Sequence, residues 1–151
     1  MKAFFAGSFD PFTIGHRSIV ERALRLFPRI VIAIGYNEHK PGEWPVEQRL
    51  KAIRNLYAGQ DNVEVVAYKG LTVDAARQAG ASVLLRGVRS NADFEYERNL
   101  ADTNREISGM ETVFLLCEPD LSFVSSSMVR ELLHNGHDIS KYIAGDFPTK
   151  E

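Results

Sequence analysis

Short apolar stretches alternate along this chain with longer segments whose apolar residues recur every three or four positions. Residues 30–34 form a continuous, β-branched apolar run, which is typical of a strand covered on both faces. Residues 15–27 instead place Ile19 and Ala23 on one side of a helix that Pro28 would end. The same reasoning predicts strands over residues 3–6, 30–34, 63–68, 83–85 and 113–117, and helices over residues 15–27, 46–57, 72–79, 92–107 and 127–134.

The predicted elements alternate between strand and helix along the whole chain. No internal repeat, low-complexity tract or linker interrupts them. Such alternation favours a parallel sheet with helices on both faces, because each return to a parallel strand needs a crossover connection. We therefore expect a Rossmann-like, doubly wound α/β fold with a five-stranded parallel sheet, in a single domain over residues 1–151.

Polar and basic residues follow each of the predicted strands. Ser8 comes after the first strand, residues 36–40 after the second, residues 70–72 after the third and residues 86–89 after the fourth. The serine run at residues 125–127 follows the fifth. In open parallel sheets, ligands bind in the crevice outside the carboxyl ends of the strands. The sequence therefore predicts one composite binding site at that edge of the sheet.

Composition and charge narrow the class of partner. The chain has 151 residues, of which 44% are hydrophobic and 25% charged, as in ordinary globular domains. Its net charge of -2 argues against a nucleic-acid partner, which usually needs a strongly basic face. The apolar run near the start is too short for a signal peptide or a membrane span, so we expect no membrane association. One cysteine excludes an intrachain disulfide and suits a reducing, cytoplasmic location.

The loop between the first predicted strand and helix, residues 7–16, has the features of an anion site. Gly7 allows a ligand close to the backbone, and Thr13 can cap the following helix. His16 then lies in the first helical turn, where free N–H groups and the helix dipole attract phosphate. A histidine in register with Ile19 can equally belong to the core, so both interpretations stay open here. The loop is neither a dinucleotide G-x-G-x-x-G fingerprint nor a P-loop, because the spacings and the P-loop lysine are absent.

Four segments together resemble a known family of enzymes. Residues 7–16 read Gly-Ser-Phe-Asp-Pro-Phe-Thr-Ile-Gly-His, which is similar to the T/H-x-G-H signature of the nucleotidylyltransferase superfamily. Leu-Arg-Gly-Val-Arg at residues 85–89, Asp-Phe-Glu-Tyr-Glu at residues 93–97 and Phe-Val-Ser-Ser-Ser-Met-Val-Arg at residues 123–130 match one family in particular. On these collinear motifs, the chain resembles the bacterial phosphopantetheine adenylyltransferases over nearly its whole length.

The resemblance implies a reaction and its partners. That family transfers an adenylyl group from ATP to 4'-phosphopantetheine, giving dephospho-CoA and pyrophosphate, in the penultimate step of coenzyme A synthesis. The resemblance also implies Mg2+ bound through ATP, and assembly as a homohexamer. Two alternatives stay open: another nucleotidylyltransferase, with nicotinamide mononucleotide or a polyol phosphate as acceptor, and a nucleotide-binding regulator without turnover.

The resemblance further implies roles for individual residues. His16, Lys40 and Arg86 would be catalytic, with His16 stabilising the transition state and the two cations holding the acceptor phosphate. Acceptor binding would involve Ser8, Lys40, Thr72 and Arg86. The ATP-binding set would comprise Ser8, Phe9, His16, Gly87, Val88, Arg89, Glu97, Leu121, Ser122, Phe123, Val124, Ser125, Ser126 and Ser127.

Several of these residues also have simpler interpretations. Lys40 can be a solvated surface lysine, Thr72 a helix N-cap, and Glu97 part of the solvated face of an acidic helix. One serine of the run would suffice to cap the last helix. Leu121 stands where some members of the family have tryptophan, so no aromatic contact is expected at that point.

The remaining reactive residue types look structural. His39, His134 and His137 show no metal-ligand spacing with one another or with Cys117. Cys117 is predicted to be a buried strand residue rather than a nucleophile. Trp44, the only tryptophan, is predicted to pack between elements.

Overall fold

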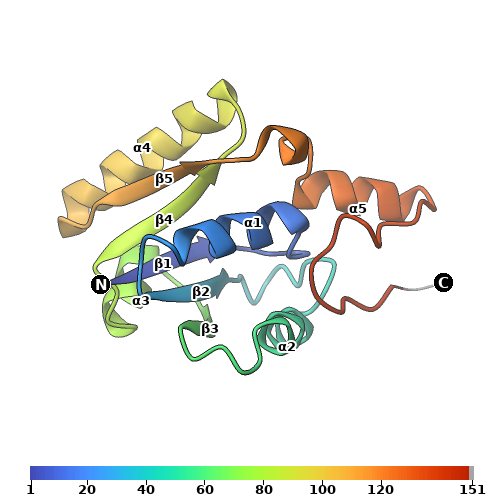
Figure 1. Cartoon of the computed structure of the whole chain (residues 1–151), viewed down its shortest axis with the longest axis horizontal. Helices are drawn as coiled ribbons and strands as arrows, with labels where there is room; N and C mark the ends of the chain where they lie inside the picture. The colour runs from blue at the N-terminus through green and yellow to red at the C-terminus, as the bar shows by residue number, and fades with distance from the viewer. Residues whose placement is uncertain (150–151) are drawn as a thin grey trace.

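Five parallel strands form the centre of the protein, with helices packed on both faces of the sheet (Figure 1). The computed structural model describes residues 1–149. The strands are β1 (Lys2–Gly7), β2 (Arg29–Gly35), β3 (Val63–Tyr68), β4 (Val83–Val88) and β5 (Thr112–Leu116), and the helices are α1 (Ile14–Ala23), α2 (Val46–Leu56), α3 (Thr72–Gln78), α4 (Asn91–Ser108) and α5 (Ser126–His134). A short 3₁₀ helix, η1 (Pro119–Leu121), precedes α5. The predicted α/β class and the parallel five-stranded sheet are confirmed.

The order of the strands creates a crevice at the end of β1. The order is β3-β2-β1-β4-β5, so the chain builds one half of the sheet and then crosses over β1 to build the other. β1 pairs in parallel with both neighbours, with Phe5 opposite Ile32 of β2 and Leu85 of β4. Where the strand order reverses in this way, the connections on either side leave in opposite directions and a ligand can enter between them. The end of β1 therefore lies in the region where the sequence predicts a site.

Alternate side chains of the strands enter two separate cores. Phe5 and Ile32 belong to the larger core, in which the sheet packs against α1, α2 and α5. Phe4 and Val31 belong to the smaller core on the other face, together with Val73 of α3. Because both faces are covered, β1 and β2 need apolar residues at successive positions, which explains their continuous apolar runs.

Trp44 packs between elements, as predicted. Its side chain is buried against Phe147, with ring centroids 5.5 Å apart, and its indole N–H donates to the carbonyl of Pro148 at 2.7 Å. The indole thus joins the segment before α2 to the C-terminal segment.

Two element boundaries differ from the prediction, and the others agree to within one residue. α1 ends at Ala23 rather than at residue 27, because the N–H groups of Leu26 and Phe27 both donate to the carbonyl of Ala23 and close a turn. β4 continues to residue 88, because its last three residues pair with β5. Arg86 therefore lies within a strand rather than after it, and the sheet fixes its backbone.

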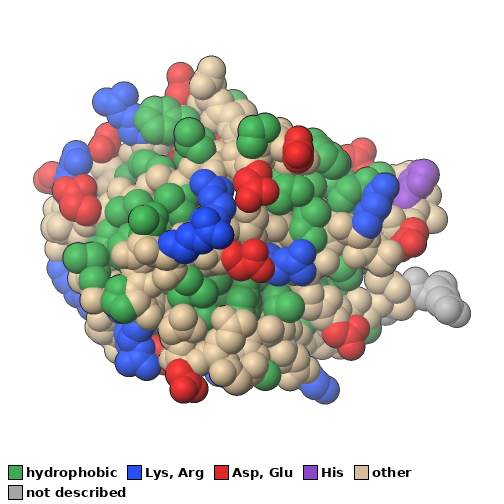
Figure 2. Space-filling model, in the orientation of Figure 1, with side chains coloured by type: hydrophobic (Ala, Val, Ile, Leu, Met, Phe, Trp, Pro, Cys, Tyr) green, Lys and Arg blue, Asp and Glu red, His purple; other side chains and the backbone are tan. Residues whose placement is uncertain are grey.

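Large hydrophobic side chains remain exposed on α4 and β5. They are Phe94, Tyr96, Leu100 and Ile107 of α4 and Leu116 at the end of β5. Figure 2 shows hydrophobic surface on this side of the molecule, interspersed with charged side chains. None of the helices in residues 1–149 is long and apolar enough to cross a membrane.

Candidate active site

Three cavities open at the carboxyl ends of the strands, and Ser8 lines all of them. The histidine cavity, of about 510 Å³, contains His16 and lies between the β1–α1 loop, the end of β4 and the start of α5. The helix groove, of about 460 Å³, is lined by the start of α3 and by α4. The lysine cavity, of about 360 Å³, lies beside the loop after β2 and contains Lys40. The histidine cavity and the helix groove also share Arg86 and Glu97, so the cavities adjoin one another.

Most of the predicted ATP-binding residues line the histidine cavity. They are Ser8, Phe9, His16, Gly87, Arg89, Glu97, Val124, Ser125, Ser126 and Ser127. Four others line none of the three cavities as far as residues 1–149 define them: Val88, Leu121, Ser122 and Phe123. Val88 is buried in the sheet, and the hydroxyl of Ser122 donates to the carbonyl of Pro119 in its own loop. The contact of these four residues with ATP stays a prediction.

His16 and Thr13 cap the start of α1 reciprocally, which confirms Thr13 as the N-cap. The hydroxyl of Thr13 accepts from the N–H of His16 at 3.3 Å, and the N–H of Thr13 donates to Nδ1 of His16 at 2.9 Å. Histidine here takes the place that glutamate or glutamine usually has in a capping box. Because Nδ1 accepts a hydrogen bond, the proton of the neutral ring is on Nε2. His16 therefore has one N–H to offer to a ligand in the histidine cavity.

Aromatic rings surround the imidazole and keep it neutral. The ring of Phe12 stacks on it with centroids 5.3 Å apart, and the ring of Phe9 meets it edge-on at 4.9 Å. This burial, together with the positive charges of Arg86 and Arg89, lowers the pKa of His16 to about 3. The side chain is packed against the core and also lines the cavity. The core interpretation is therefore confirmed, whereas the contact of His16 with a phosphate stays a prediction.

Phe9 adopts an uncommon backbone conformation at the back of this cavity. Its φ of 47° lies in the left-handed region, and its side chain is buried. The ring lies over Gly7, where a Cβ atom would come within 3.0 Å of two ring atoms. The sequence assigned Gly7 to the approach of a ligand, and the structure adds a second reason, since any larger residue would displace the Phe9 ring from His16.

Arg86 and Glu97 form an ion pair at the boundary between the histidine cavity and the helix groove. Nε and Nη2 of Arg86 donate to the two carboxylate oxygens of Glu97 at 2.7 and 2.5 Å, while Nη1 donates to the carbonyl of Ala6. Burial acts to lower the pKa of Arg86, but the hydrogen bonds and charge of Glu97 outweigh this effect and raise it. Glu97 is buried, so its interpretation as part of a solvated helix face is wrong. Its carboxylate orients Arg86, and its contact with ATP stays a prediction.

Two further arginines line the histidine cavity, and only Arg89 was predicted from the sequence to have a role. Arg89 pairs with Asp93 of α4, with Nε 3.0 Å from Oδ2. Arg130 of α5 donates through Nη1 to the carbonyl of Asp10 at 2.7 Å and through Nη2 to the hydroxyl of Ser127 at 3.3 Å. Both acceptors of Arg130 are uncharged, so its charge is available to an anion. The sequence offered one signal for Arg130. It follows the serine run by about one helical turn, so it lies on the same face of the helix as the serines.

The serines at the start of α5 have separate structural roles. Ser125 is the N-cap, with its hydroxyl accepting from the N–H of Met128 at 3.1 Å, as the simpler interpretation predicted. Ser126 donates to the carbonyl of Pro11 at 2.8 Å and so joins α5 to the β1–α1 loop. Ser127 is exposed at the edge of the cavity. An anion at this helix start would therefore bind to Ser127 and to free backbone N–H groups.

Lys40 and Thr72 lie outside the histidine cavity, each beside a neighbouring one. Lys40 is exposed, on a turn closed by a hydrogen bond from its N–H to the carbonyl of Asn37. Thr72 lines the helix groove and is the first residue of α3, whereas Leu71 is the N-cap, so the interpretation of Thr72 as an N-cap is wrong. The Thr72 hydroxyl instead pairs with the hydroxyl of Tyr68 at 2.8 Å, which joins the start of α3 to the end of β3.

Cys117 also differs from the prediction. It follows β5 rather than lying within it, and it is half-buried beside the histidine cavity rather than enclosed in the sheet. Burial raises the pKa of its thiol, which keeps it in the less reactive protonated form. Within residues 1–149, no three histidine, cysteine, aspartate or glutamate side chains are grouped closely enough to hold a metal ion.

Three sequence relatives of this chain are named after the same activity. The cytidylyltransferase-like family model matches residues 4–132. The phosphopantetheine adenylyltransferase of Porphyromonas gingivalis is 52% identical over 145 residues, which cover 96% of this chain and 95% of that protein. The phosphopantetheine adenylyltransferase of Bacteroides thetaiotaomicron is 51% identical over 142 residues, or 94% of each chain. That of Flavobacterium psychrophilum is 46% identical over 139 residues, or 92% of each chain.

Solved structures with much lower identity share the fold. A bifunctional NMN adenylyltransferase/ADP ribose pyrophosphatase from Francisella tularensis has a TM-score of 0.71 at 18% identity. That alignment covers 97% of this chain but 46% of the bifunctional protein, so the chain corresponds to less than half of it. This likeness supports the Rossmann-like architecture, whereas the family follows from the near-full-length relatives. On their identity and coverage, the chain belongs to the phosphopantetheine adenylyltransferase family, within the cytidylyltransferase-like group.

Proposed function

We propose that this protein transfers an adenylyl group from ATP to 4'-phosphopantetheine, producing dephospho-CoA and pyrophosphate. The named activity of relatives that share about half of their residues with this chain supports the choice of acceptor. Transfer between two large ligands needs two binding regions whose ends meet. Ser8 and Arg86 line both the histidine cavity and the helix groove, and this shared boundary is the observation that carries the proposal.

ATP would occupy the histidine cavity. Its lining supplies the neutral donor His16, the cations Arg89 and Arg130, and the start of α5. A helix start binds phosphate through free N–H groups, and a guanidinium can hold two phosphate oxygens at once. Arg89, Arg130 and the serine loop would hold the β- and γ-phosphates, which leaves the α-phosphate next to His16 and Ser8.

The acceptor would lie along the helix groove with its phosphate at Ser8 and Arg86. Phe4, Leu84 and Leu100 give the groove apolar walls, and residues 70–72 supply backbone polar groups. Ligand sites commonly combine such apolar walls with a few polar groups, and a flexible arm with two amides suits this lining. Lys40 would reach the phosphate from the lysine cavity, which shares Ser8 with the groove.

The reaction would be a direct in-line displacement. An oxygen of the acceptor phosphate forms a bond to the α-phosphorus while the bond from that phosphorus to the oxygen bridging to the β-phosphorus breaks. Pyrophosphate leaves with the bonding electrons. The attacking oxygen is already an anion, so no strong general base is required. Nε2–H of His16 would donate to α-phosphate oxygens as charge grows on them. Because the pKa of His16 is about 3, the ring would act as a fixed hydrogen-bond donor and not as a proton shuttle.

Magnesium would enter as part of MgATP. Within the described residues no cluster of carboxylates or imidazoles is available to hold an ion. Phosphate oxygens and water suit magnesium well, so an ion carried by the nucleotide fits this site. When bound, it would reduce the negative charge on the phosphates.

A pyrophosphate-release assay over a panel of acceptors tests the proposal. We expect efficient turnover with 4'-phosphopantetheine, weak turnover with nicotinamide mononucleotide or glycerol phosphate, and none with unphosphorylated pantetheine. Each buried donor left unpaired costs about 1–3 kcal/mol, so two missed amide contacts should reduce efficiency by roughly thirtyfold to more than ten-thousandfold.

Other outcomes of the panel would identify a different function. Comparable efficiency with nicotinamide mononucleotide would indicate a nucleotidylyltransferase with another acceptor. Use of unphosphorylated pantetheine would remove the proposed nucleophile. ATP binding without pyrophosphate release for any acceptor would indicate a nucleotide-binding regulator.

We also propose that the chain works in the cytoplasm as a homohexamer. The exposed hydrophobic side chains of α4 and β5 offer an apolar surface for contact between subunits, and they include Phe94, Ile107 and Leu116. Light scattering should give the mass of six chains, and a stable monomer at working concentration would contradict this assembly.

A further inference from the structure

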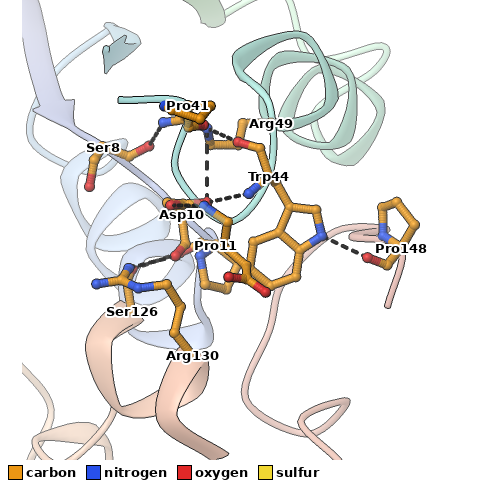
Figure 3. A network of polar contacts seen from close by, with 10 residues as sticks. Ser8, Asp10, Pro11, Pro41, Trp44, Arg49, Ser126, Arg130 and Pro148 are labelled. Carbon is orange, nitrogen blue, oxygen red and sulfur yellow. Dashed lines mark hydrogen bonds and ion pairs between the residues drawn. The ribbon is translucent and has the colours of Figure 1, made fainter. Parts of the chain in front are cut away.

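A buried pair, Asp10 and Arg49, joins two loops that carry proposed site residues. Arg49 is 3% exposed and Asp10 is 6% exposed. Figure 3 shows the two side chains between the loop that begins at Ser8 and the turn that contains Pro41 and Trp44. Neither side chain has a role in the chemistry proposed above. A buried ionic pair costs desolvation energy, so such a pair can serve to position other groups as well as to stabilise the fold.

The Asp10 carboxylate holds the turn after Lys40. Its two oxygens accept from the backbone N–H groups of Glu43 and Trp44, at 2.8 and 2.9 Å. Gly42 packs directly on the carboxylate, since a Cβ at this position would lie 2.6 Å from Oδ2, and its φ of +75° favours glycine. The turn therefore follows the position of the carboxylate.

The Arg49 guanidinium connects the same turn to the β1–α1 loop. From α2, its Nε donates to the carbonyl of Trp44 at 2.8 Å and its Nη2 to the carbonyl of Pro41 at 3.4 Å. Its Nη1 donates to the carbonyl of Ser8 at 2.8 Å. Nε also lies 4.0 Å from Oδ1 of Asp10, so the two charges offset each other. One rigid fork thus fixes three carbonyls from two loops, which a single ammonium group cannot do.

The backbone of Asp10 extends this network to the ATP side. Its carbonyl accepts from Arg130 of α5 at 2.7 Å, and the neighbouring carbonyl of Pro11 accepts from Ser126. The turn after Lys40, the loop that holds Ser8 and the start of α5 therefore share one set of hydrogen bonds. Lys40 itself is exposed and immediately precedes Pro41, so its position depends on how this turn is held.

We propose that Asp10 and Arg49 are positioning residues that hold the Lys40 turn against Ser8, and so set where the acceptor phosphate binds relative to ATP. The inference rests on the proposed function, because it assigns Lys40 to the acceptor. It predicts that loss of the network weakens use of the acceptor much more than use of ATP. A purely structural role would instead lower stability without separating the two ligands.

Arg49→Met and Arg54→Met form the matched pair of variants. Arg54 lies on the same helix and donates from Nε and Nη2 to the carbonyl of Val65 on β3, away from both loops. We expect Arg49→Met to raise KM for 4'-phosphopantetheine about tenfold to a hundredfold, with KM for ATP changing less than about threefold. Arg54→Met should leave both KM values within about twofold. Arg49→Lys should restore only part of the loss, because it keeps the charge without the fork.

Trp44 supplies a second measurement that needs no catalysis. It is the only tryptophan, it is 3% exposed, and both its N–H and its carbonyl belong to the network. We expect Arg49→Met to shift its emission to the red and to increase quenching by acrylamide, and Arg54→Met to leave both unchanged. Asp10→Asn places an amide donor opposite a backbone N–H, so it should move the fluorescence in the same direction. It also serves if Arg49→Met does not fold.

The two measurements separate failure of this inference from failure of the proposed function. If the unaltered chain releases no pyrophosphate with 4'-phosphopantetheine, the proposed function fails, while the fluorescence still reports on the network. Equal changes in KM for both ligands, or a split that Arg54→Met reproduces, would overturn the positioning role. Unchanged Trp44 fluorescence in both Arg49→Met and Asp10→Asn would do the same.

Discussion

Replacing His16 by glutamine should reduce the loss of stability that the protein suffers in acid. The pKa of His16 is lowered to about 3 in the folded protein, against an ordinary value of 6.5. At pH values between these two pKa values, the imidazole is protonated in the unfolded chain but stays neutral in the native state. Titration of His16 therefore leaves the free energy of unfolding unchanged above about pH 6.5 and lowers it as the pH falls from 6.5 towards 3.

The size of the effect follows from the two pKa values. The slope approaches about 1.4 kcal/mol per pH unit for one proton, and the integrated loss from pH 7 to pH 5 is about 2 kcal/mol. Glutamine suits the test because it is one of the usual residues at this position of a capping box and does not titrate. Its side-chain oxygen can accept from the N–H of Thr13 in place of Nδ1, so the start of α1 should stay capped.

Urea unfolding at pH 7 and pH 5 measures this difference. Both proteins are compared at one fixed concentration, since assembly would make stability depend on concentration. We expect the fall in unfolding free energy between the two pH values to be about 2 kcal/mol smaller for His16→Gln than for the unaltered chain. An identical fall in the two proteins would show that the ring is not held neutral, and would remove the basis for a fixed neutral donor.

Other substitutions test the proposed division of labour in the site. His16→Ala should lower kcat on the order of a hundredfold or more with a small change in ATP affinity, because the donor acts on developing charge, and near-normal turnover would exclude that role. Lys40→Ala should mainly raise KM for the acceptor, whereas Arg89→Ala and Arg130→Ala should mainly raise KM for ATP; equal losses for both ligands in titrations would contradict this partition. Glu97→Gln should weaken acceptor use roughly tenfold by releasing Arg86, and steady-state kinetics that showed a loss confined to ATP would instead support direct contact of Glu97 with the nucleotide.

Local sequence patterns were sufficient for the fold because each element carries its own signal. The β-branched run at residues 30–34 and the helical stripes reflect burial on two faces or on one, and their alternation leaves few topologies open. The cap formed by Thr13 was predictable for the same reason, since it depends on residues three positions apart. The family motifs indicated the reaction. They also identified Arg86 and Glu97 as site residues, but they did not show that these two side chains pair.

Three predictions failed where a contact between two elements, rather than a pattern within one, decided the outcome. The end of β4 depends on pairing with β5, and the hydroxyl of Thr72 is taken by Tyr68 rather than by the helix start. Glu97 is buried and pairs with Arg86, which lies eleven residues earlier on β4. No periodicity within either segment contains that information.

The sequence by itself determined which elements form, in what order, and which residue types reach the carboxyl edge of the sheet, because these follow from neighbours in the chain. Only the tertiary structure decided which of these side chains are charged and which of them contact one another. The low pKa of His16 results from rings and arginines that the fold collects around it. Arg49 has no recognisable motif, yet it contacts carbonyls 41 and 8 residues away along the chain. Such properties depend on desolvation and on distances between segments, and these exist only once the chain has folded.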